Sequence, residues 1–273
     1  MQILISPSQL SNALTSTRII PVRALMNDPV SKQQDKRDAF VIPGSVDFDL
    51  DGEGSEHNAT FPHTLPSIGA LSRYLARNGI TEKTPLVVYD TRGVYCSARV
   101  WWMLKALGHE HVSLLDGGLP GWSRHNLPLS EPRPTRLAQY NANAQANWFV
   151  NADYVLSVLQ SETQIIDARS SPRFYGEVPE PREGLRSGHM PGAINIPYQS
   201  LLNADTFLRI DALTAVFSEA GVDLSRPILC SCGSGITACI IGVAALLCGA
   251  NNVVVYDGSW SEWGAVNRFP VTR

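Results

Sequence analysis

The chain has 273 residues, of which 44% are hydrophobic and 17% charged, and its formal net charge is −3. This length suits about two domains of ~150 residues each, and the composition is that of a folded globular protein, which excludes a disordered chain. A slightly acidic balance argues against a nucleic-acid partner. No apolar stretch approaches the ~20 residues needed to cross a bilayer. The first residues carry no Lys or Arg, so we expect no signal peptide, no membrane partner and a cytoplasmic location.

In the first half of the chain, two short apolar runs predict buried strands, Leu86–Tyr89 and Val112–Leu115, on either side of a predicted helix, Ala98–Leu107. After them, residues 131–147 are polar, contain proline and lack periodicity, which is typical of a linker. We therefore expect one domain over residues 1–130 and a second over residues 148–273.

The second half alternates strand-like and helix-like segments in the same way. The predicted strands are Gln164–Asp167, Pro227–Cys230 and Val253–Tyr256, and the predicted helices are Asn151–Leu159, Ile210–Ala220 and Thr237–Leu247. The second of these helices stops before Gly221, as a helix with a glycine C-cap does. Such alternation predicts an α/β fold in which a mainly parallel sheet is flanked by helices.

The two halves are related by an internal repeat. If residues 87–91 are set beside residues 228–232, an ungapped alignment also pairs Gly108 with Gly249 and Trp122 with Trp263. Upstream, Pro43-Gly-Ser-Val46 resembles Pro191-Gly-Ala-Ile194, and Ile19-Ile-x-x-Arg23 resembles Ile165-Ile-x-x-Arg169. The period is too long for a solenoid, so we interpret the chain as two tandem copies of one domain.

The segment that carries chemistry joins the predicted strand Pro227–Cys230 to the helix that follows, and it reads Ser-Cys232-Gly-Ser-Gly-Ile-Thr237. Ligands of open α/β sheets bind at the carboxyl ends of strands, next to helix N-termini. Gly233 and Gly235 let the backbone turn tightly, so that N–H groups converge on the cysteine sulfur and favour its thiolate. Ser234 and Thr237 add hydroxyl donors, and Ile236 completes the loop. The alternative is a plain turn with an inert cysteine.

The ungapped alignment places Thr91 of the first copy opposite Cys232. No strong nucleophile occurs there, so we expect one active site, in the second copy, and a catalytically inactive first domain.

With these motifs the sequence resembles the tandem-domain rhodanese-type sulfurtransferases over nearly its whole length. The most specific marks are Cys232-Gly-Ser-Gly-Ile-Thr, Ser187-Gly-His-Met-Pro-Gly-Ala, Tyr256-Asp-Gly-Ser-Trp-Ser-Glu-Trp-Gly and Arg99-Val-Trp-Trp-Met-Leu. The loop is most similar to the branch that uses 3-mercaptopyruvate, although that branch typically has Val where this chain has Ile236. The thiosulfate branch, which typically carries Arg or Lys inside the loop, is the alternative. The resemblance implies two rhodanese-like domains and a persulfide on Cys232.

The same resemblance implies a substrate-binding pair, Arg173 and Arg182. A 2-oxo acid offers a carboxylate and a ketone oxygen, which suit forked guanidinium donors. Alternatively, the two arginines are solvated and paired with Glu177, Glu180 or Glu183.

The resemblance further implies that Asp51 and His63 relay protons to Ser234, because loss of sulfur from mercaptopyruvate leaves an enolate that needs a proton. The segment between them is one residue longer than the family pattern, and a surface histidine in a proline-flanked loop is the alternative.

The remaining expectations concern cofactors, partners and rival functions. The resemblance implies no metal or organic cofactor, a small-molecule sulfur donor, and a thiol, cyanide or thioredoxin as acceptor. The five cysteines indicate thiols rather than a disulfide framework, and Cys230-x-Cys232 lacks the second Cys/His pair of a zinc site. A related phosphatase would need Arg where Ala238 stands. A non-catalytic binding module would not need the intact loop.

Overall fold

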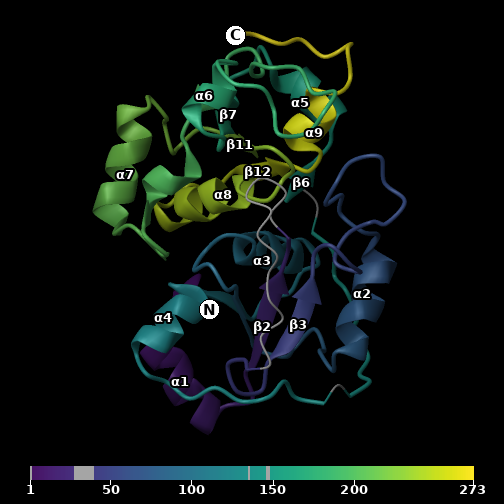
Figure 1. The fold of residues 1–273 in the computed structure, drawn as a ribbon, viewed down its shortest axis with the longest axis vertical. Helices are drawn as coiled ribbons and strands as arrows, with labels where there is room; N and C mark the ends of the chain where they lie inside the picture. The colour runs from purple at the N-terminus through teal and green to yellow at the C-terminus, as the bar shows by residue number, and fades with distance from the viewer. Residues whose placement is uncertain (1, 28–39, 135, 146–147) are drawn as a thin grey trace. The chain divides into compact units, whose positions relative to one another are not determined.

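The computed structural model describes residues 2–27, 40–134, 136–145 and 148–273. These residues form two compact units (Figure 1). The described residues within 1–58, 65–146 and 204–206 form the first unit, and those within 59–64, 147–203 and 207–273 form the second. Within the described residues, no helix is both long and apolar enough to span a membrane.

Each unit is built around a five-stranded sheet whose paired strands are all parallel. The first sheet has the order β1-β5-β4-β2-β3 and the second the order β6-β12-β11-β7-β8. The two sheets have the same topology, because β1, β2, β3, β4 and β5 take the same places in the first sheet as β6, β7, β8, β11 and β12 in the second. The predicted α/β fold with two repeated, mainly parallel sheets is therefore confirmed.

In the first unit the elements are β1 (Leu4–Ile5), α1 (Pro7–Ser16), β2 (Ile20–Leu25), β3 (Val46–Asp49), α2 (Ile68–Arg77), β4 (Leu86–Tyr89), α3 (Ser97–Ala106), β5 (Val112–Leu115) and α4 (Gly118–Arg124). One face of the sheet is covered by α1 and α4, because Leu10 and Trp122 pack against Val87 and Tyr89. The linker also contacts this unit, since Ala138 N–H donates to the carbonyl of Ala76 (2.8 Å). Residues 135 and 146–147 of the predicted linker lie outside the described residues.

The second half contains β6 (Phe149–Val150), α5 (Ala152–Val158), β7 (Gln164–Asp167), α6 (Ser171–Phe174), β8 (Ile194–Asn195), a 3₁₀ turn (Tyr198–Leu201), β9 (Leu202–Asn203), β10 (Thr206–Phe207), α7 (Ile210–Glu219), β11 (Ile228–Ser231), α8 (Ala238–Leu247), β12 (Val253–Tyr256) and α9 (Ser259–Trp263). The short strands β9 and β10 pair with each other.

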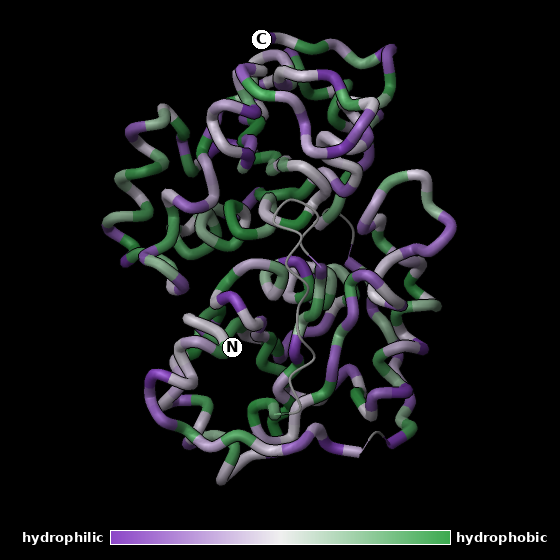
Figure 2. Tube along the Cα trace, in the orientation of Figure 1, coloured by the Kyte–Doolittle hydropathy of each residue, from purple (hydrophilic) through white to green (hydrophobic). Residues whose placement is uncertain are grey.

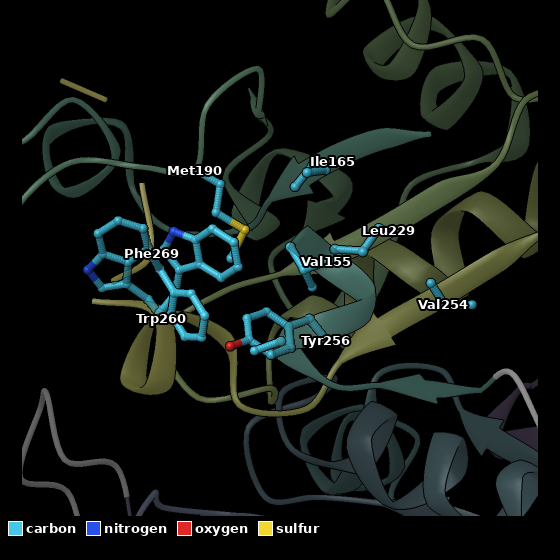
Figure 3. Packing of buried hydrophobic residues seen from close by; sticks show 10 residues of the cluster. Val155, Ile165, Met190, Leu229, Val254, Tyr256, Trp260 and Phe269 are labelled. Atoms are coloured by element: carbon cyan, nitrogen blue, oxygen red, sulfur yellow. The ribbon is translucent and has the colours of Figure 1, made fainter. Parts of the chain in front are cut away.

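The core of the second unit encloses strand β11, which leads into the Cys232 loop. Leu229 and Tyr256 face a cluster that includes Trp260 and Phe269 from the chain's last segment, as Figure 3 shows. Neighbouring residues of a strand point to opposite faces, so Cys230 points to the face that α8 covers. The buried residues of α8 are almost all apolar, and its trace is mainly green in Figure 2. The central strand β11 is therefore enclosed on both faces and ends in the Cys232 loop.

The repeat alignment needs two corrections, because loops of different length shift the register. The carbonyls of Pro85 and Pro227 each accept the first N–H of the neighbouring strand, from Ile20 and Gln164. Ile20 therefore corresponds to Gln164, and the predicted pairing of Ile19 with Ile165 is two residues out of register.

Leu86 corresponds to Ile228 for the same kind of reason. The N–H of Leu86 donates to the carbonyl of the residue just before β5, and the N–H of Ile228 donates to the carbonyl of the residue just before β12. The position after the strand, equivalent to Cys232, is consequently Asp90. The prediction of Thr91 was wrong by one residue, because the first loop is one residue longer.

Candidate active site

Cys232 is the first residue after β11, in the loop that leads into α8, and only 2% of its surface is exposed. The loop is anchored by the start of α9. Trp260 N–H donates to the carbonyl of Cys232 (3.0 Å), and Ser261 donates to the carbonyl of Gly233 through both its N–H (2.8 Å) and its Oγ (2.6 Å). These bonds fix the carbonyls of Cys232 and Gly233 against the start of α9.

The N–H groups of this loop have few partners of their own. Within the described part of the chain, the N–H groups of Gly233, Ser234, Ile236 and Thr237 make no hydrogen bond. Gly235 has φ +74°, a conformation that glycine adopts without strain. Unpaired N–H groups at the start of a helix attract a negative charge. The loop can therefore stabilise a thiolate or a bound anion.

The equivalent loop of the first unit binds a carboxylate with its backbone N–H groups. There the carboxylate of Asp90 accepts three backbone N–H groups of its own loop, from Arg92 (2.8 Å), Tyr95 (2.7 Å) and Ser97 (2.9 Å). The same strand-to-helix turn thus binds an internal anion in one copy. In the other copy a cysteine takes that position.

Ser259 was not singled out from the sequence, and it lies beside the sulfur. Its Oγ accepts the N–H of Cys232 (3.2 Å), lies 4.0 Å from Cys232 Sγ, and donates to the carbonyl of Tyr256 (2.9 Å). Its φ of +46° is unusual for a residue other than glycine and indicates local strain. The motif Tyr256-Asp-Gly-Ser-Trp-Ser marked this segment in the sequence, but not the contact itself.

The two predicted arginines reach the loop from the segment after β7. A Cβ built on Gly233 would lie 3.2 Å from Nη2 of Arg173, so the guanidinium packs against the loop backbone. Arg182 Nη1 donates to Ser261 Oγ (3.3 Å), and that same hydroxyl donates to Gly233. Both cationic groups therefore lie next to the residue that follows Cys232.

Glu180 holds Arg173 in this position and is the site residue that the sequence identified only as an alternative partner. Its carboxylate accepts Arg173 Nη2 (2.6 Å) and Nε (3.2 Å), and also Arg169 Nη1 (2.9 Å). The Glu180 side chain is 1% exposed and that of Arg173 20%. Arg169 in turn pairs with Asp167 and stacks over the ring of Trp260. The arginine is thus held by a buried network rather than being solvated.

His63 and Ser234 are brought together within the second unit. His63 Nδ1 is 3.1 Å from Ser234 Oγ, and both residues belong to the second unit. Asp51 belongs to the first unit, where its Oδ2 accepts the N–H of Asn27 (2.5 Å). The His63–Ser234 contact has the geometry of a proton relay, and the part assigned to Asp51 stays a prediction.

The other cysteines have different surroundings from Cys232. Cys230 is fully buried, and burial, together with the neighbouring Cys239 and Cys232, raises the pKa of its thiol well above the usual value. Cys239 donates to the carbonyl of Gly235 (3.3 Å) inside α8. Partial burial also raises the pKa of Cys248. The raised pKa values of Cys230 and Cys248 favour their protonated, unreactive forms.

Comparison with known proteins places this arrangement in a family. The family model described as a rhodanese-like domain matches twice, over residues 6–125 and 151–266. The chain belongs to the rhodanese family.

Rhodanese relatives with assigned activities align with most of the chain. The 3-mercaptopyruvate sulfurtransferase of Rattus norvegicus is 40% identical over 227 residues, covering 81% of this chain and 76% of that protein. The thiosulfate sulfurtransferase of the same species is 36% identical over 271 residues, with coverages of 95% and 91%. Among solved structures, the 3-mercaptopyruvate enzyme SseA from Escherichia coli superposes with a TM-score of 0.84 at 33% identity, covering 95% of this chain and 99% of SseA.

Proposed function

We propose that this chain is a sulfurtransferase that takes a sulfane sulfur from 3-mercaptopyruvate onto Cys232 and passes it to a thiol or cyanide acceptor. The observation that carries the proposal is a cysteine in a loop with four N–H groups that make no hydrogen bond among the described residues, with two arginines at the adjacent Gly233. The relatives named for this activity support the choice of donor.

The proposed chemistry assigns a task to each group. The Cys232 thiolate attacks the donor sulfur, the carbon–sulfur bond breaks, and its electron pair stays on carbon as the pyruvate enolate. The enolate then takes a proton and becomes pyruvate, while Cys232 carries a persulfide. A nucleophilic acceptor, such as a small thiol, cyanide or thioredoxin, removes the outer sulfur and regenerates the thiolate.

Arg173 and Arg182 are proposed to bind the donor's carboxylate and ketone oxygen. Ser234, paired with His63, is proposed to deliver the proton to the enolate carbon, with Asp51 as an upstream group of the relay. Gly233, Gly235, Ile236 and Thr237 are proposed to contribute the backbone that surrounds the bound donor. No step of this scheme calls for a metal or organic cofactor.

Thiosulfate is the alternative donor, by the same persulfide route, and the thiosulfate sulfurtransferase relative supports it. Thiosulfate is a dianion without a carbon skeleton, and residues 232–237 carry no cationic side chain to bind it. We therefore expect a preference for 3-mercaptopyruvate of at least about tenfold in kcat/KM, which corresponds to ~1.4 kcal/mol.

Two measurements test the proposal. Intact-mass spectrometry after exposure to donor should show one added sulfur on the wild type and on Cys230→Ser, and none on Cys232→Ser. A sulfur mapped to Cys230 or Cys96 would overturn the nucleophile assignment. Measuring kcat/KM for both donors with one common acceptor then decides between them, and a preference for thiosulfate would replace the donor proposed here.

A further inference from the structure

The first unit contains a surface cavity of about 380 Å³ that is rich in cationic side chains, and we call it the basic cavity. Its lining residues include four cations and no carboxylate: Arg18, Lys83, Arg133 and Arg136. Within the described residues, none of the four forms an ion pair with a carboxylate. Four positive charges around one hollow create a field that attracts an anion from solution.

The backbone holds two of these arginines in place. Arg133 Nη2 donates to the carbonyl of Asn78, the C-cap residue of α2 (2.7 Å). The next residue, Gly79, has φ +71°, and a Cβ there would lie 2.7 Å from the carbonyl oxygen of Arg136. Only glycine permits this close approach of the residues after Ser130 to the end of α2. The cationic rim is thus built by specific contacts rather than by mobile side chains alone.

The charges are packed closely enough to affect one another. Nε of Arg133 is buried without a hydrogen-bond partner among the described residues. Burial lowers the pKa of Arg133, and the neighbouring Arg18 and Arg136 lower it further. A second hollow, of about 350 Å³, is lined by the same three arginines and Pro134. A carboxylate or phosphate placed among these groups would relieve their repulsion.

The rest of the lining is different in character. Ile20, Pro85, Leu137 and Ala138 contribute apolar surface to the same cavity. Glu82, the nearby acidic residue, does not line it, and its Oε2 accepts the N–H of Asn141 (3.3 Å). The volume lies within the ~300–1,000 Å³ typical of sites for small organic ligands.

From this arrangement we infer that the basic cavity binds a small organic anion with two or more negative charges, of the phosphate or carboxylate type. The charged groups contact Arg18, Arg133 and Arg136, and the carbon body lies against Leu137 and Ala138. This binding is separate from sulfur transfer, because every lining residue belongs to the first unit and none belongs to the Cys232 site.

Isothermal titration calorimetry with ATP, without magnesium and at about 0.15 M salt, tests the inference. The double variant Arg18→Gln/Arg136→Gln removes two exposed cations of the cavity. Its matched control, Arg73→Gln/Arg77→Gln, removes the same charge from exposed positions on or at the end of α2. We expect one saturable site in the wild type, binding at least about tenfold weaker in the cavity variant, and less than about threefold change in the control.

Parallel titrations with other anions show which kind of charged group the cavity binds. Citrate in place of ATP distinguishes a carboxylate ligand from a phosphate ligand, and either one satisfies the inference if the cavity variant weakens it. Pyrophosphate that binds as tightly as ATP would overturn the part played by the apolar wall. Equal losses in both double variants, or no saturable binding of ATP or citrate, would overturn the site itself.

Chemical labelling supplies a second readout that does not depend on heat. Lys83 is exposed, so its acetylation by an N-hydroxysuccinimide ester can be followed by peptide mass spectrometry. Saturating ATP should slow labelling of Lys83 several-fold and leave Lys105, outside the cavity, unaffected. Equal protection of both lysines would contradict binding at the cavity.

Discussion

Glu180 is expected both to stabilise the second unit and to hold Arg173 in place. The variant Glu180→Gln tests both effects, through the free energy of unfolding and through KM. The carboxylate receives three guanidinium hydrogen bonds, two from Arg173 and one from Arg169, in a position that is 1% exposed. Glutamine keeps the shape of the side chain and one oxygen acceptor, but it removes the negative charge. Its amide N–H groups would also face the N–H groups of the arginines, and two donors cannot hydrogen-bond to each other. Breaking a buried ion pair from one side costs about 3–5 kcal/mol.

We place the expected loss at the lower end, about 3 kcal/mol in the free energy of unfolding, because the remaining amide oxygen still accepts one bond. Arg173, no longer fixed, should also bind the donor less well, so KM for 3-mercaptopyruvate should rise at least about threefold while kcat changes less. Urea unfolding followed by tryptophan fluorescence gives the first quantity, and steady-state kinetics gives the second.

The matched control is Glu177→Gln, which removes an exposed carboxylate from the same segment. It should change the unfolding free energy by no more than about 0.5 kcal/mol. A loss below about 1 kcal/mol for Glu180→Gln, together with an unchanged KM, would show that the network neither stabilises the unit nor positions the arginine.

Three other outcomes are expected. Arg182→Ala should raise KM for 3-mercaptopyruvate by about 13-fold to 160-fold, the equivalent of about 1.5–3 kcal/mol for a charged hydrogen bond. Unchanged kinetics would remove Arg182 from the donor site. His63→Ala should lower kcat more with 3-mercaptopyruvate than with thiosulfate, since only the first leaves a carbanion to protonate; equal effects on both donors would refute the relay. Burial lowers the pKa of His109 to about 4, below its unfolded value of ~6.5. The folded form therefore binds fewer protons, and stability that is complete above pH ~6.5 should fall by about 3 kcal/mol as the pH drops to 4. His109→Gln should abolish that part of the slope in acid unfolding curves.

The sequence predicted best where a short apolar run determines its own structure. The strands Gln164–Asp167, Leu86–Tyr89 and Val112–Leu115 have the predicted bounds, and β11 is shifted by one residue. Strand β2 was not predicted as such, because it contains Pro21 and Arg23. Arg23 is 1% exposed, and Asp47 on the neighbouring strand accepts its guanidinium (2.8 Å). This pairing is not a local property of the sequence.

The site was predicted where its residues are contiguous in the sequence and missed where they are far apart. The Cys232 loop is contiguous, so its glycines and the following helix could be recognised together. The contact of His63 with Ser234 joins residues 171 positions apart, and only the family resemblance indicated it. Glu180 could not be assigned from spacing, because three glutamates surround the arginine pair in the sequence and burial alone distinguishes the one that binds.

Asp90 has a consequence for the two copies of the repeat. The first copy supplies its own carboxylate to the loop as an internal brace, with three charged hydrogen bonds worth about 1.5–3 kcal/mol each. Replacing Asp90 by cysteine would not by itself build a second reactive loop, because the substitution removes that brace at the same step. We therefore expect the two halves to stay different at this position, with a carboxylate bound in one loop and a cysteine in the other.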